Sequence, residues 1–364
     1  MRVALVYNIN HEVAEEKKNS SPFNSSKNYT PNHTSVLYKQ RHQEVNDEFA
    51  EWDTIETVHA MQKAIAFKHE VILIEADENV AESLKKAKPQ MVFNVAEGRY
   101  GPSREAQVPA ICEMLQIPYT GSDPITLGIC LEKSRAKEIL SYYKIPTPNF
   151  RVIEDLNGLK FTPQILPAII KPLSEGSSKG IFDSSLVSNE TQLSSEVERI
   201  LTLYHQPAIV EEYLPGREFT VSLLGNGDKV EVLPIVELNF ESLPDGVNPI
   251  YSYEAKWVWD QLDNPLDIFK CPATLSTRLQ KQIETICLDA FEVLKIKDWA
   301  RIDVRCDGKN RPHIIEINPI PGILPNPDDH SCFPKAARAA GINYDEMINK
   351  ILDSAIERYA KLYA

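Results

Sequence analysis

The sequence predicts a mixed α/β and α+β architecture, with a parallel sheet in the N-terminal part and a strand-rich C-terminal part. Apolar runs at residues 2–7, 70–74 and 91–95 have the length of buried strands, and an amphipathic segment at 54–67 separates the first two. Strands that alternate with helices favour a parallel sheet with right-handed crossovers. From about residue 223, strand-like runs follow one another closely. The 364 residues suffice for two or three domains.

The N-terminal unit is expected to span residues 1–123. A second helix is predicted near 105–115, and the strand-like segment 117–121 closes the unit. The first crossover is interrupted by residues 11–48, a polar stretch rich in Ser and Asn without a regular period. This stretch is either a surface loop or a lid over the acceptor site. The helix at 54–67 is predicted from the apolar face formed by Ile55, Val58, Met61 and Ile65.

A central unit is expected over residues 124–222 and a C-terminal unit over residues 223–364. A long helix is predicted near 124–142, and the proline-rich segment 145–148 after it ends that helix. The C-terminal unit contains a predicted hairpin and ends in an amphipathic helix. Strands of the central unit are expected at 167–172 and 208–214, and the apolar face of the last helix comprises Met347, Ile348, Ile351, Leu352, Ala355 and Ile356.

Composition and charge limit the partners of this chain. The formal net charge of −13 disfavours a nucleic-acid partner, although a few local cations suffice for a nucleotide site. No apolar run approaches the roughly 18–20 residues that span a bilayer, and the N-terminal sequence MRVALVY has no signal-peptide pattern. The six cysteines show no CxxC pairing, which is typical of free thiols in a reducing cytoplasm. We therefore expect a cytoplasmic protein without membrane or nucleic-acid partners.

A loop of small residues, EGSSKG at 175–180, follows the predicted strand that contains Lys171. Small residues let backbone N–H groups approach an anion, and the hydroxyls of Ser177 and Ser178 add donors. Lys171 supplies a cation close by. The segment lacks the GK[ST] signature of a Walker A loop. Taken alone, a structural turn explains it equally well.

Two carboxylates, Glu211 and Glu218, flank a turn at Pro215–Gly216. Carboxylates at this spacing can accept hydrogen bonds from an adenine amino group and from ribose hydroxyls. Taken alone, the segment is equally compatible with ordinary surface charge.

The most specific pattern is the predicted hairpin from Arg301 to Gly322. Asp303 and Glu316 each lie between apolar neighbours, where a carboxylate is costly unless it is paired or bound to a metal. Asn318 lies on the same strand face as Glu316, and these oxygen ligands suit Mg²⁺. Arg301 lies on the same face as Asp303 and could stabilise a developing oxyanion. The hairpin therefore predicts a metal site, with a structural ion pair as the alternative.

These three elements, in this order, resemble the ATP-grasp fold, and the similarity is strongest to the D-alanine–D-alanine ligase family. The resemblance covers about residues 50–364 and the first strand. It implies a Rossmann-like N-terminal domain with a parallel sheet, followed by a two-part ATP-grasp fold that holds the nucleotide. The matching segments are FNVAEG (93–98), IPYTGSD (117–123), LEK (131–133), IIKPLSEGSSKG (169–180), VEEYLPGREFTV (210–221), YEAKW (253–257), ARIDV (300–304) and EINPIPG (316–322).

The resemblance also implies roles for individual residues. Lys256, on a mobile loop, would reach the γ-phosphate of ATP, and Arg301 with the Gly322 N–H would stabilise a tetrahedral intermediate. Ser177 is placed with this catalytic group. Asp303, Glu316 and Asn318 would bind two Mg²⁺ ions, for which Mn²⁺ could substitute. The ATP-binding residues implied are Lys133, Lys171, Ser178, Glu211, Glu212, Leu214 and Glu218.

The substrate side departs from the family pattern at three positions. Asp53 stands where the family has a longer Glu for the first substrate's amino group, Glu97 stands in place of a usual His, and Trp257 in place of a usual Tyr. Ser331 matches the serine that binds the acceptor carboxylate, although it follows an insertion at 325–330. Because the ATP and Mg²⁺ positions match, the resemblance implies the same chemistry with an altered substrate.

The expected function is therefore ATP-dependent ligation of a carboxylate to an amine through an acylphosphate. The substrates would be small molecules, either other than D-alanine or D-alanine itself as in cell-wall synthesis, and a homodimer is compatible with the resemblance. The alternatives are another ATP-grasp enzyme class, such as a carboxylase-type partner, and a non-catalytic ATP-binding regulator.

Overall fold

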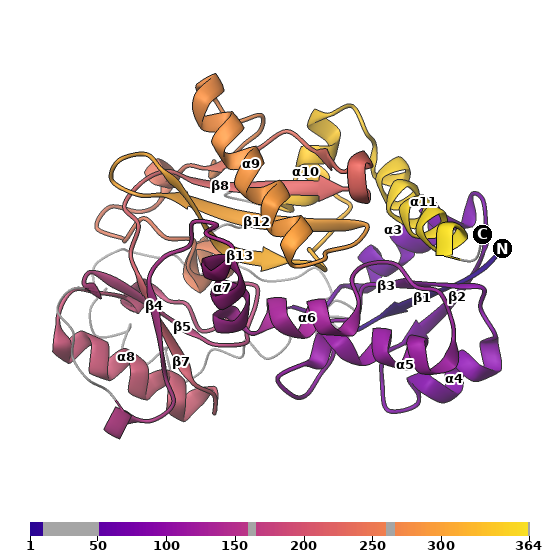
Figure 1. Ribbon diagram of the computed structural model, residues 1–364, viewed down its shortest axis with the longest axis horizontal. Helices are drawn as coiled ribbons and strands as arrows, with labels where there is room; N and C mark the ends of the chain where they lie inside the picture. Colours follow the sequence, from indigo (N-terminus) through magenta and orange to yellow (C-terminus); the bar gives the residue numbers. More distant parts are fainter. Residues whose placement is uncertain (10–50, 159–164, 260–265, 363–364) are drawn as a thin grey trace, which may run out of the picture.

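The computed structural model describes residues 1–9, 51–158, 165–259 and 266–362. The polar stretch predicted as a loop or lid at 11–48 lies outside these residues. Figure 1 shows an N-terminal unit around a parallel sheet and two further sheets that lie beside each other. Within the described ranges, no helix is long and apolar enough to cross a membrane. All six cysteines are free thiols.

The N-terminal unit forms the predicted parallel sheet, with strand order β2-β1-β3. The expected strand at 117–121 is reduced to a single parallel bridge between Val92 and Tyr119. Thr54 caps the first helix by accepting the Thr57 N–H, so Asp53 lies just before the helix. The elements are β1 (Arg2–Tyr7), α3 (Ile55–Ala66), β2 (Glu70–Glu75), α4 (Val80–Ala87), β3 (Met91–Asn94), the 3₁₀ turn η1 (Arg104–Ala106) and α5 (Gln107–Leu115).

The prediction of one long helix at 124–142 is wrong. Two helices, α6 (Pro124–Leu131) and α7 (Lys133–Tyr142), meet at Glu132, which has an extended backbone with ψ of 96°. The physical reason is a competing hydrogen bond, because the Lys133 N–H donates to the Leu173 carbonyl at 3.1 Å and not to its own helix. This break starts α7 at the edge of the central unit and brings Lys133 to the site.

The central unit is a four-stranded antiparallel sheet covered by one helix. Its strand order is β4-β7-β5-β6, and α8 packs its apolar side chains against Ile170 and Val210. The expected strands at 167–172 and 208–214 are confirmed with slightly shorter bounds. The elements are β4 (Phe150–Ile153), β5 (Ala168–Pro172), β6 (Leu186–Val187), α8 (Glu190–Leu203) and β7 (Ala208–Glu212).

The C-terminal unit is a six-stranded antiparallel sheet in the order β11-β10-β8-β12-β13, with β9 paired to β8. Its first strand begins at Glu218, so the boundary expected after residue 222 falls inside β8. The elements are β8 (Glu218–Leu224), β9 (Glu231–Val232), β10 (Val236–Leu238), a π-helical segment η7 (Glu254–Trp259), β11 (Phe269–Lys270), α9 (Thr277–Val293), β12 (Trp299–Cys306), β13 (Pro312–Asn318), α10 (Cys332–Ala339) and α11 (Tyr344–Leu362).

The two faces of this sheet carry different kinds of side chain. Side chains alternate along β12, so Ile302 and Val304 pack under α9 while Arg301, Asp303 and Arg305 point to the opposite face. A β-bulge in β13, opposite Asp303 and Val304, adds Ile315 to the face that carries Glu316. One face therefore forms a core, and the other is polar and faces the central unit.

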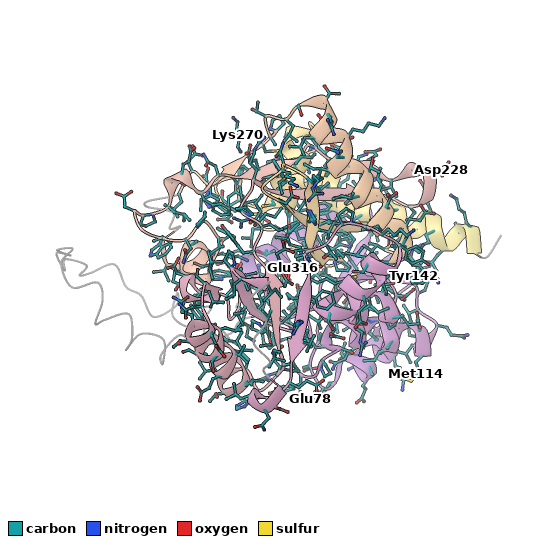
Figure 2. The ribbon with its side chains drawn as sticks, turned by 60° about the vertical axis from the view of Figure 1, so that its left-hand side comes forward. Glu78, Met114, Tyr142, Asp228, Lys270 and Glu316 are labelled. Atoms are coloured by element: carbon teal, nitrogen blue, oxygen red, sulfur yellow. The ribbon has the colours of Figure 1, made fainter. Side chains whose placement is uncertain are left out.

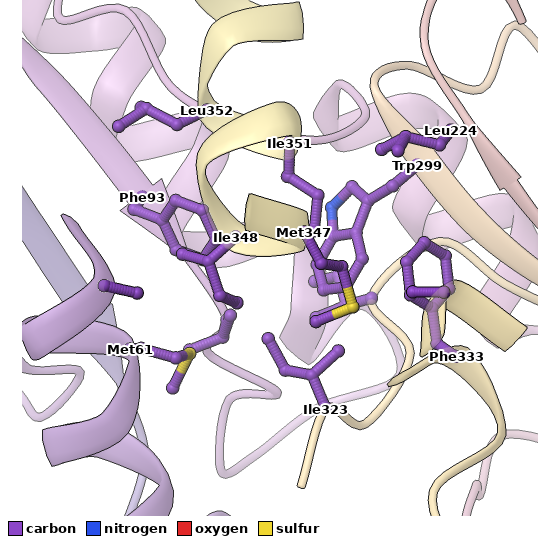
Figure 3. Close-up of a cluster of buried hydrophobic side chains, with 14 of the residues drawn as sticks. Met61, Phe93, Leu224, Trp299, Ile323, Phe333, Met347, Ile348, Ile351 and Leu352 are labelled. Carbon is purple, nitrogen blue, oxygen red and sulfur yellow. The ribbon is translucent and has the colours of Figure 1, made fainter. Parts of the chain in front are cut away.

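The last helix, α11, packs on α3 of the N-terminal unit, and both lie near the chain termini in Figure 1. Figure 3 shows Met347, Ile348 and Ile351 between Met61 of α3 and Trp299 of β12. Burying each such side chain contributes roughly 1.5–3 kcal/mol. The C-terminal segment thus fixes the N-terminal unit against the six-stranded sheet. Figure 2 shows Glu316 near the centre of the molecule.

Candidate active site

Two adjoining cavities, of about 240 and 50 Å³, lie where the three units meet. Each predicted site residue lines one or both of them. The larger cavity is lined by the residues expected to bind adenosine, which are Glu211, Glu212, Leu214 and Glu218, and also by Asp53, Trp257 and Ser331. The smaller cavity is lined by Glu97, Lys133 and Asn318. The residues shared by both cavities are Glu51, Glu175, Ser177, Arg301, Glu316 and Gly322.

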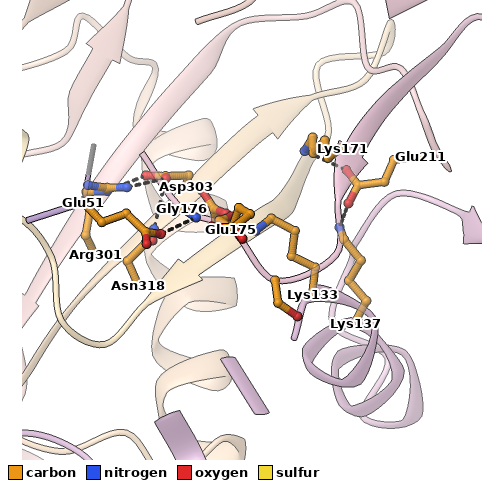
Figure 4. Close-up of polar contacts among 12 residues, drawn as sticks. Glu51, Lys133, Lys137, Lys171, Glu175, Gly176, Glu211, Arg301, Asp303 and Asn318 are labelled. Atoms are coloured by element: carbon orange, nitrogen blue, oxygen red, sulfur yellow. Dashed lines mark hydrogen bonds and ion pairs between the residues drawn. The ribbon is translucent and has the colours of Figure 1, made fainter. Parts of the chain in front are cut away.

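The hairpin β12–β13 brings its two carboxylates together, because Asp303 is the direct cross-strand partner of Glu316. The guanidinium of Arg301 donates to both oxygens of Asp303 at 3.0 Å, and the amide of Asn318 donates to Asp303 at 3.2 Å. Figure 4 shows this group. The ammonium of Lys133 lies 2.9 Å from Glu316. Both carboxylates are thus held by cations of the same site.

The pKa of Glu316 reflects the cationic side chains that surround it. Although burial opposes ionisation, the ammonium groups of Lys133 and Lys171 lower the pKa of Glu316 to about 2. Among the described residues, no three His, Cys, Asp or Glu side chains form a metal-holding group. The ligand set available to a cation is therefore two carboxylates, directly opposed on neighbouring strands, and the amide oxygen of Asn318. Carboxylate and amide oxygens are the hard ligands that Mg²⁺ prefers, so the set fits Mg²⁺.

A buried group of charges occupies the far end of the larger cavity. Glu211, which is 1% exposed, lies between Lys171 at 2.9 Å and Lys137 at 3.3 Å (Figure 4). Burial works against ionisation of Glu211, but the two ammonium groups lower its pKa. Lys137 also donates to Thr147 at 3.0 Å. An ionised Glu211 is an acceptor, as an adenine amino group requires.

Glu218, on β8, is held in a similar way. Its carboxylate accepts from Arg305 at 2.7 Å, and Arg305 also donates to the hydroxyl of Tyr213 at 2.9 Å. Leu214 is buried, and the Glu212 carboxylate accepts from Asn149 at 2.7 Å.

The serine loop (residues 175–180) is bound to the N-terminal unit. Glu51 accepts the Gly176 N–H at 2.6 Å (Figure 4). Both oxygens of Glu51 also accept from one guanidinium nitrogen of Arg104, at 2.8 and 2.6 Å. Ser177 and Ser178 adopt left-handed φ of 50° and 59°, as a tight loop demands. The Ser178 hydroxyl donates to the Tyr251 carbonyl at 2.8 Å.

The segment that carries Lys256 is helical and not an irregular loop, since Glu254–Trp259 form the π-helical turn η7. Burial, together with the nearby Arg301, lowers the pKa of Lys256 to about 8. The indole N–H of Trp257 donates to the Ser177 carbonyl at 3.3 Å. This hydrogen bond ties the segment to the serine loop.

Ser331 and Gly322 lie together despite the insertion between them. The Ser331 hydroxyl donates to the Gly322 carbonyl at 2.9 Å and accepts the Leu324 N–H at 3.2 Å. A Cβ on Gly322 would meet no atom within 4 Å, so the space beside its backbone is open to the cavity.

Acidic residues of the N-terminal unit also face the site. Burial raises the pKa of Asp53 to about 7. Burial and the neighbouring Glu105 raise the pKa of Glu97 well above its usual range, and burial with the Glu51 charge raises that of Glu105 to about 8. The wall on this side of the cavities is therefore rich in carboxylates.

The sequence interpretation missed several residues of the site. Glu51 lies two positions before Asp53, and its longer side chain reaches the serine loop, so Asp53 is not the sole acidic residue available to an amino group. Arg104 and Glu105 were not missed, because the resemblance implies a place near the substrate pocket for them, although a charge pair at a helix N-terminus explains them equally well. The sequence indicated Lys137 and Arg305 only weakly. Lys137 lies four positions after Lys133, and Arg305 lies two positions after Asp303.

Comparisons with known proteins show the family of this chain. A family model described as the D-ala D-ala ligase C-terminus matches residues 148–353, more than half of the chain. The D-alanine–D-alanine ligase of Nitrosococcus oceani is 33% identical over 287 residues, which are 78% of this chain and 83% of that protein. An uncharacterized protein, y4sG, of Sinorhizobium fredii is 38% identical over 303 residues, 80% of this chain and 84% of that protein.

A solved structure shares the fold over its whole length. The D-alanine–D-alanine ligase of Bacillus anthracis, crystallised with ATP, superposes with a TM-score of 0.70 at 21% identity, covering 100% of both chains. Together with the family model and the curated relatives, this likeness decides the assignment. The chain belongs to the D-alanine–D-alanine ligase family and is an ATP-grasp carbon–nitrogen ligase.

Proposed function

We propose that this ligase uses ATP and Mg²⁺ to join the carboxylate of a small amino acid to the amine of a second small substrate. One observation carries the proposal. Four cationic side chains from four separate elements, Lys133, Lys171, Lys256 and Arg301, line two joined cavities. A reaction that gathers phosphate and carboxylate charge in one place requires such a surround.

The adenosine of ATP would lie in the larger cavity. Glu211 would accept from the adenine amino group, and Glu218 from the ribose hydroxyls. The backbone of Glu212 and Leu214 would face the base, since both residues line this cavity. Lys133, Lys171 and Ser178 would bind the phosphates at the other end.

The metal ligands would be Asp303, Glu316 and Asn318, and we expect two ions, with Mn²⁺ as a substitute. Mg²⁺ supplies charge neutralisation at the transferred phosphate. When ATP enters, Lys133 would move from Glu316 to a phosphate, because the metal replaces the charge that Lys133 provides now.

The reaction would proceed in two displacements. A carboxylate oxygen of the first substrate attacks the γ-phosphorus of ATP. The bond between this phosphorus and the β,γ-bridging oxygen breaks, and ADP leaves with that oxygen and its electron pair. The amine of the second substrate then attacks the acyl carbon, loses a proton, and phosphate leaves. Lys256 would hold the γ-phosphate, while Arg301, the Gly322 N–H and Ser177 would hold the oxygen on the reacting carbon.

The substrate side leaves two candidates. Ser331 would bind the acceptor carboxylate, and Asp53, Glu97 and Trp257 would shape the pockets. Because Glu97 and Trp257 depart from the family pattern, we propose substrates other than D-alanine. D-alanine for both substrates is the second candidate, favoured by Glu51, whose carboxylate reaches the serine loop.

The test is a screen of all pairs of D- and L-amino acids for ADP formation, with mass spectrometry of the products. We expect ADP only when amino acids are present, together with a peptide-like product. ADP formation without such a product, or no ADP with any pair, would contradict the proposal. Location in the cytoplasm stays a prediction from the cysteine pattern.

A further inference from the structure

Three carboxyl groups of the N-terminal unit line the site and have no side-chain partner among the described residues. Asp53 precedes α3, Glu97 follows β3, and Glu105 lies in the turn η1. Asp53 lines the larger cavity, and Glu97 and Glu105 line the smaller one. Glu105 is only 8% exposed. Within the part of the chain that the structure describes, none of these three side chains makes a hydrogen bond or an ion pair.

The nearest cations are already engaged by other groups. Arg104 holds Glu51 and donates to the Ser174 carbonyl at 2.7 Å. Lys133 holds Glu316 and also donates to the Glu175 carbonyl. These cations lower the pKa of Glu105 only from a distance, and burial and the Glu51 charge outweigh them. The acidic wall, defined as Asp53, Glu97 and Glu105, therefore has three carboxyl groups that no cation of the described residues pairs, and a cation bound beside them would favour their ionised form.

The chemistry of this wall favours an ammonium group over a metal ion. Among the described residues, no three acidic, His or Cys side chains are arranged to coordinate one metal. An ammonium has three donors, which separate carboxylates can share. The smaller cavity, of about 50 Å³, has room for a few water-sized groups, so it admits only a short side chain.

Arg301 and Gly322 line this smaller cavity together with Glu97 and Glu105. A substrate carboxylate held at Arg301 would therefore lie across a small space from the acidic wall. Glu51 lies beside the acidic wall, lines both cavities and contacts the serine loop at Gly176. It can receive the α-ammonium of an amino acid bound in this orientation.

Resting on the ligase function proposed above, we propose that the first substrate is a short diamino acid, whose second ammonium binds between Glu97 and Glu105. The class is represented by 2,3-diaminopropionate and 2,4-diaminobutyrate. The α-carboxylate faces Arg301 and is the group activated by ATP. A neutral amino acid of similar size leaves the two carboxylates without a cation.

The variants that test this are Glu97→Gln, Glu105→Gln and the double variant. Glutamine keeps the side-chain shape and removes the charge. Because these carboxyl groups pair with none of the described residues and each disfavours the charge of the other, their neutralisation should not lower the melting temperature. Glu82→Gln, an exposed position on α4, is the matched control.

The experiment measures kcat/KM for ADP formation with both enantiomers of 2,3-diaminopropionate, 2,4-diaminobutyrate and alanine. We expect the better diamino acid to exceed alanine by about tenfold or more in the wild-type protein and in Glu82→Gln. In the double variant this ratio should fall toward one. Alanine equal to or better than every diamino acid would overturn the inference, as would a double variant that lowers all substrates equally.

A thermal-shift titration with the same amino acids separates this inference from the ligase proposal. One outcome would separate the two: no amino acid supports ADP formation, but a diamino acid reaches half of its maximal shift in melting temperature at a concentration about tenfold below that of alanine. In that case the subsite for the second ammonium is supported and the ligase proposal fails. If the wild-type protein shows no preference for a diamino acid in either measurement, the inference fails.

Discussion

The carboxylate of Glu51 accepts the backbone N–H of Gly176 at 2.6 Å, although the two residues are 125 positions apart. This hydrogen bond joins the N-terminal unit to the serine loop of the central unit. A Cβ at this position would lie 2.7 Å from the Glu51 oxygen, so a larger residue would push this carboxylate away. The serine loop is therefore positioned by a residue of another unit.

Gly176→Ala should displace Glu51 and shift the serine loop. We expect kcat/KM for ADP formation to fall by about tenfold to a hundredfold, because a small misplacement of reacting groups has this effect. The melting temperature should change little. Gly308→Ala, where a Cβ would lie 3.8 Å from Pro215, is the control that should keep full activity. Wild-type activity in Gly176→Ala would argue against a role for this contact.

Glu316→Gln should remove ADP formation while the fold persists. The change keeps the shape of the side chain but removes the charge that faces Lys133 and the expected Mg²⁺. We expect a loss of about a hundredfold or more, and the wild-type protein should lose activity in excess chelator and regain it with Mg²⁺ or Mn²⁺. Glu138→Gln, at an exposed ion pair on α7, is the matched control. Turnover that persists in chelator would exclude a metal requirement.

The pH profile should reflect Lys256. Because the pKa of Lys256 is lowered to about 8, the side chain is charged below that pH and becomes neutral above it. We expect kcat/KM for ATP, which reports the free enzyme, to decline as pH rises through about 8. Lys256→Arg keeps its charge and should shift this decline to higher pH. An unchanged profile in Lys256→Arg would assign the decline to another group, such as Lys137, whose pKa burial lowers to about 8.

Lys137→Met should weaken ATP binding more than it slows turnover. Lys137 is a positioning residue, since it contacts Glu211 and lines neither of the two cavities. Among the described residues, its loss leaves Lys171 as the cation paired with that carboxylate. We expect KM for ATP to rise about tenfold with a smaller change in kcat. Lys85→Met, at an exposed position of α4, is the control. A lower melting temperature with unchanged KM would indicate a purely structural role.

Local patterns predicted most of the secondary structure and the type of ligand. The strands at 2–7, 70–74 and 91–95 and the hairpin β12–β13 are confirmed, because burial on a strand imposes a period that the sequence displays. The helix at 124–142 was predicted wrongly, since the hydrogen bond from Lys133 to Leu173 depends on a segment 40 positions away. The bulge at Ile315 was also invisible, because it arises from pairing between strands.

The sequence by itself determined which chemical groups this protein has: the lysines, the paired oxygen ligands of the hairpin and the small residues of the serine loop. The tertiary structure alone decided which of them meet. Arg104 pairs with Glu51 across 53 positions, and Glu105, its neighbour in sequence, has no partner among the described residues. The physical reason is that periodicity encodes which side of an element is buried, whereas the partner of a buried charge depends on the path of the whole chain.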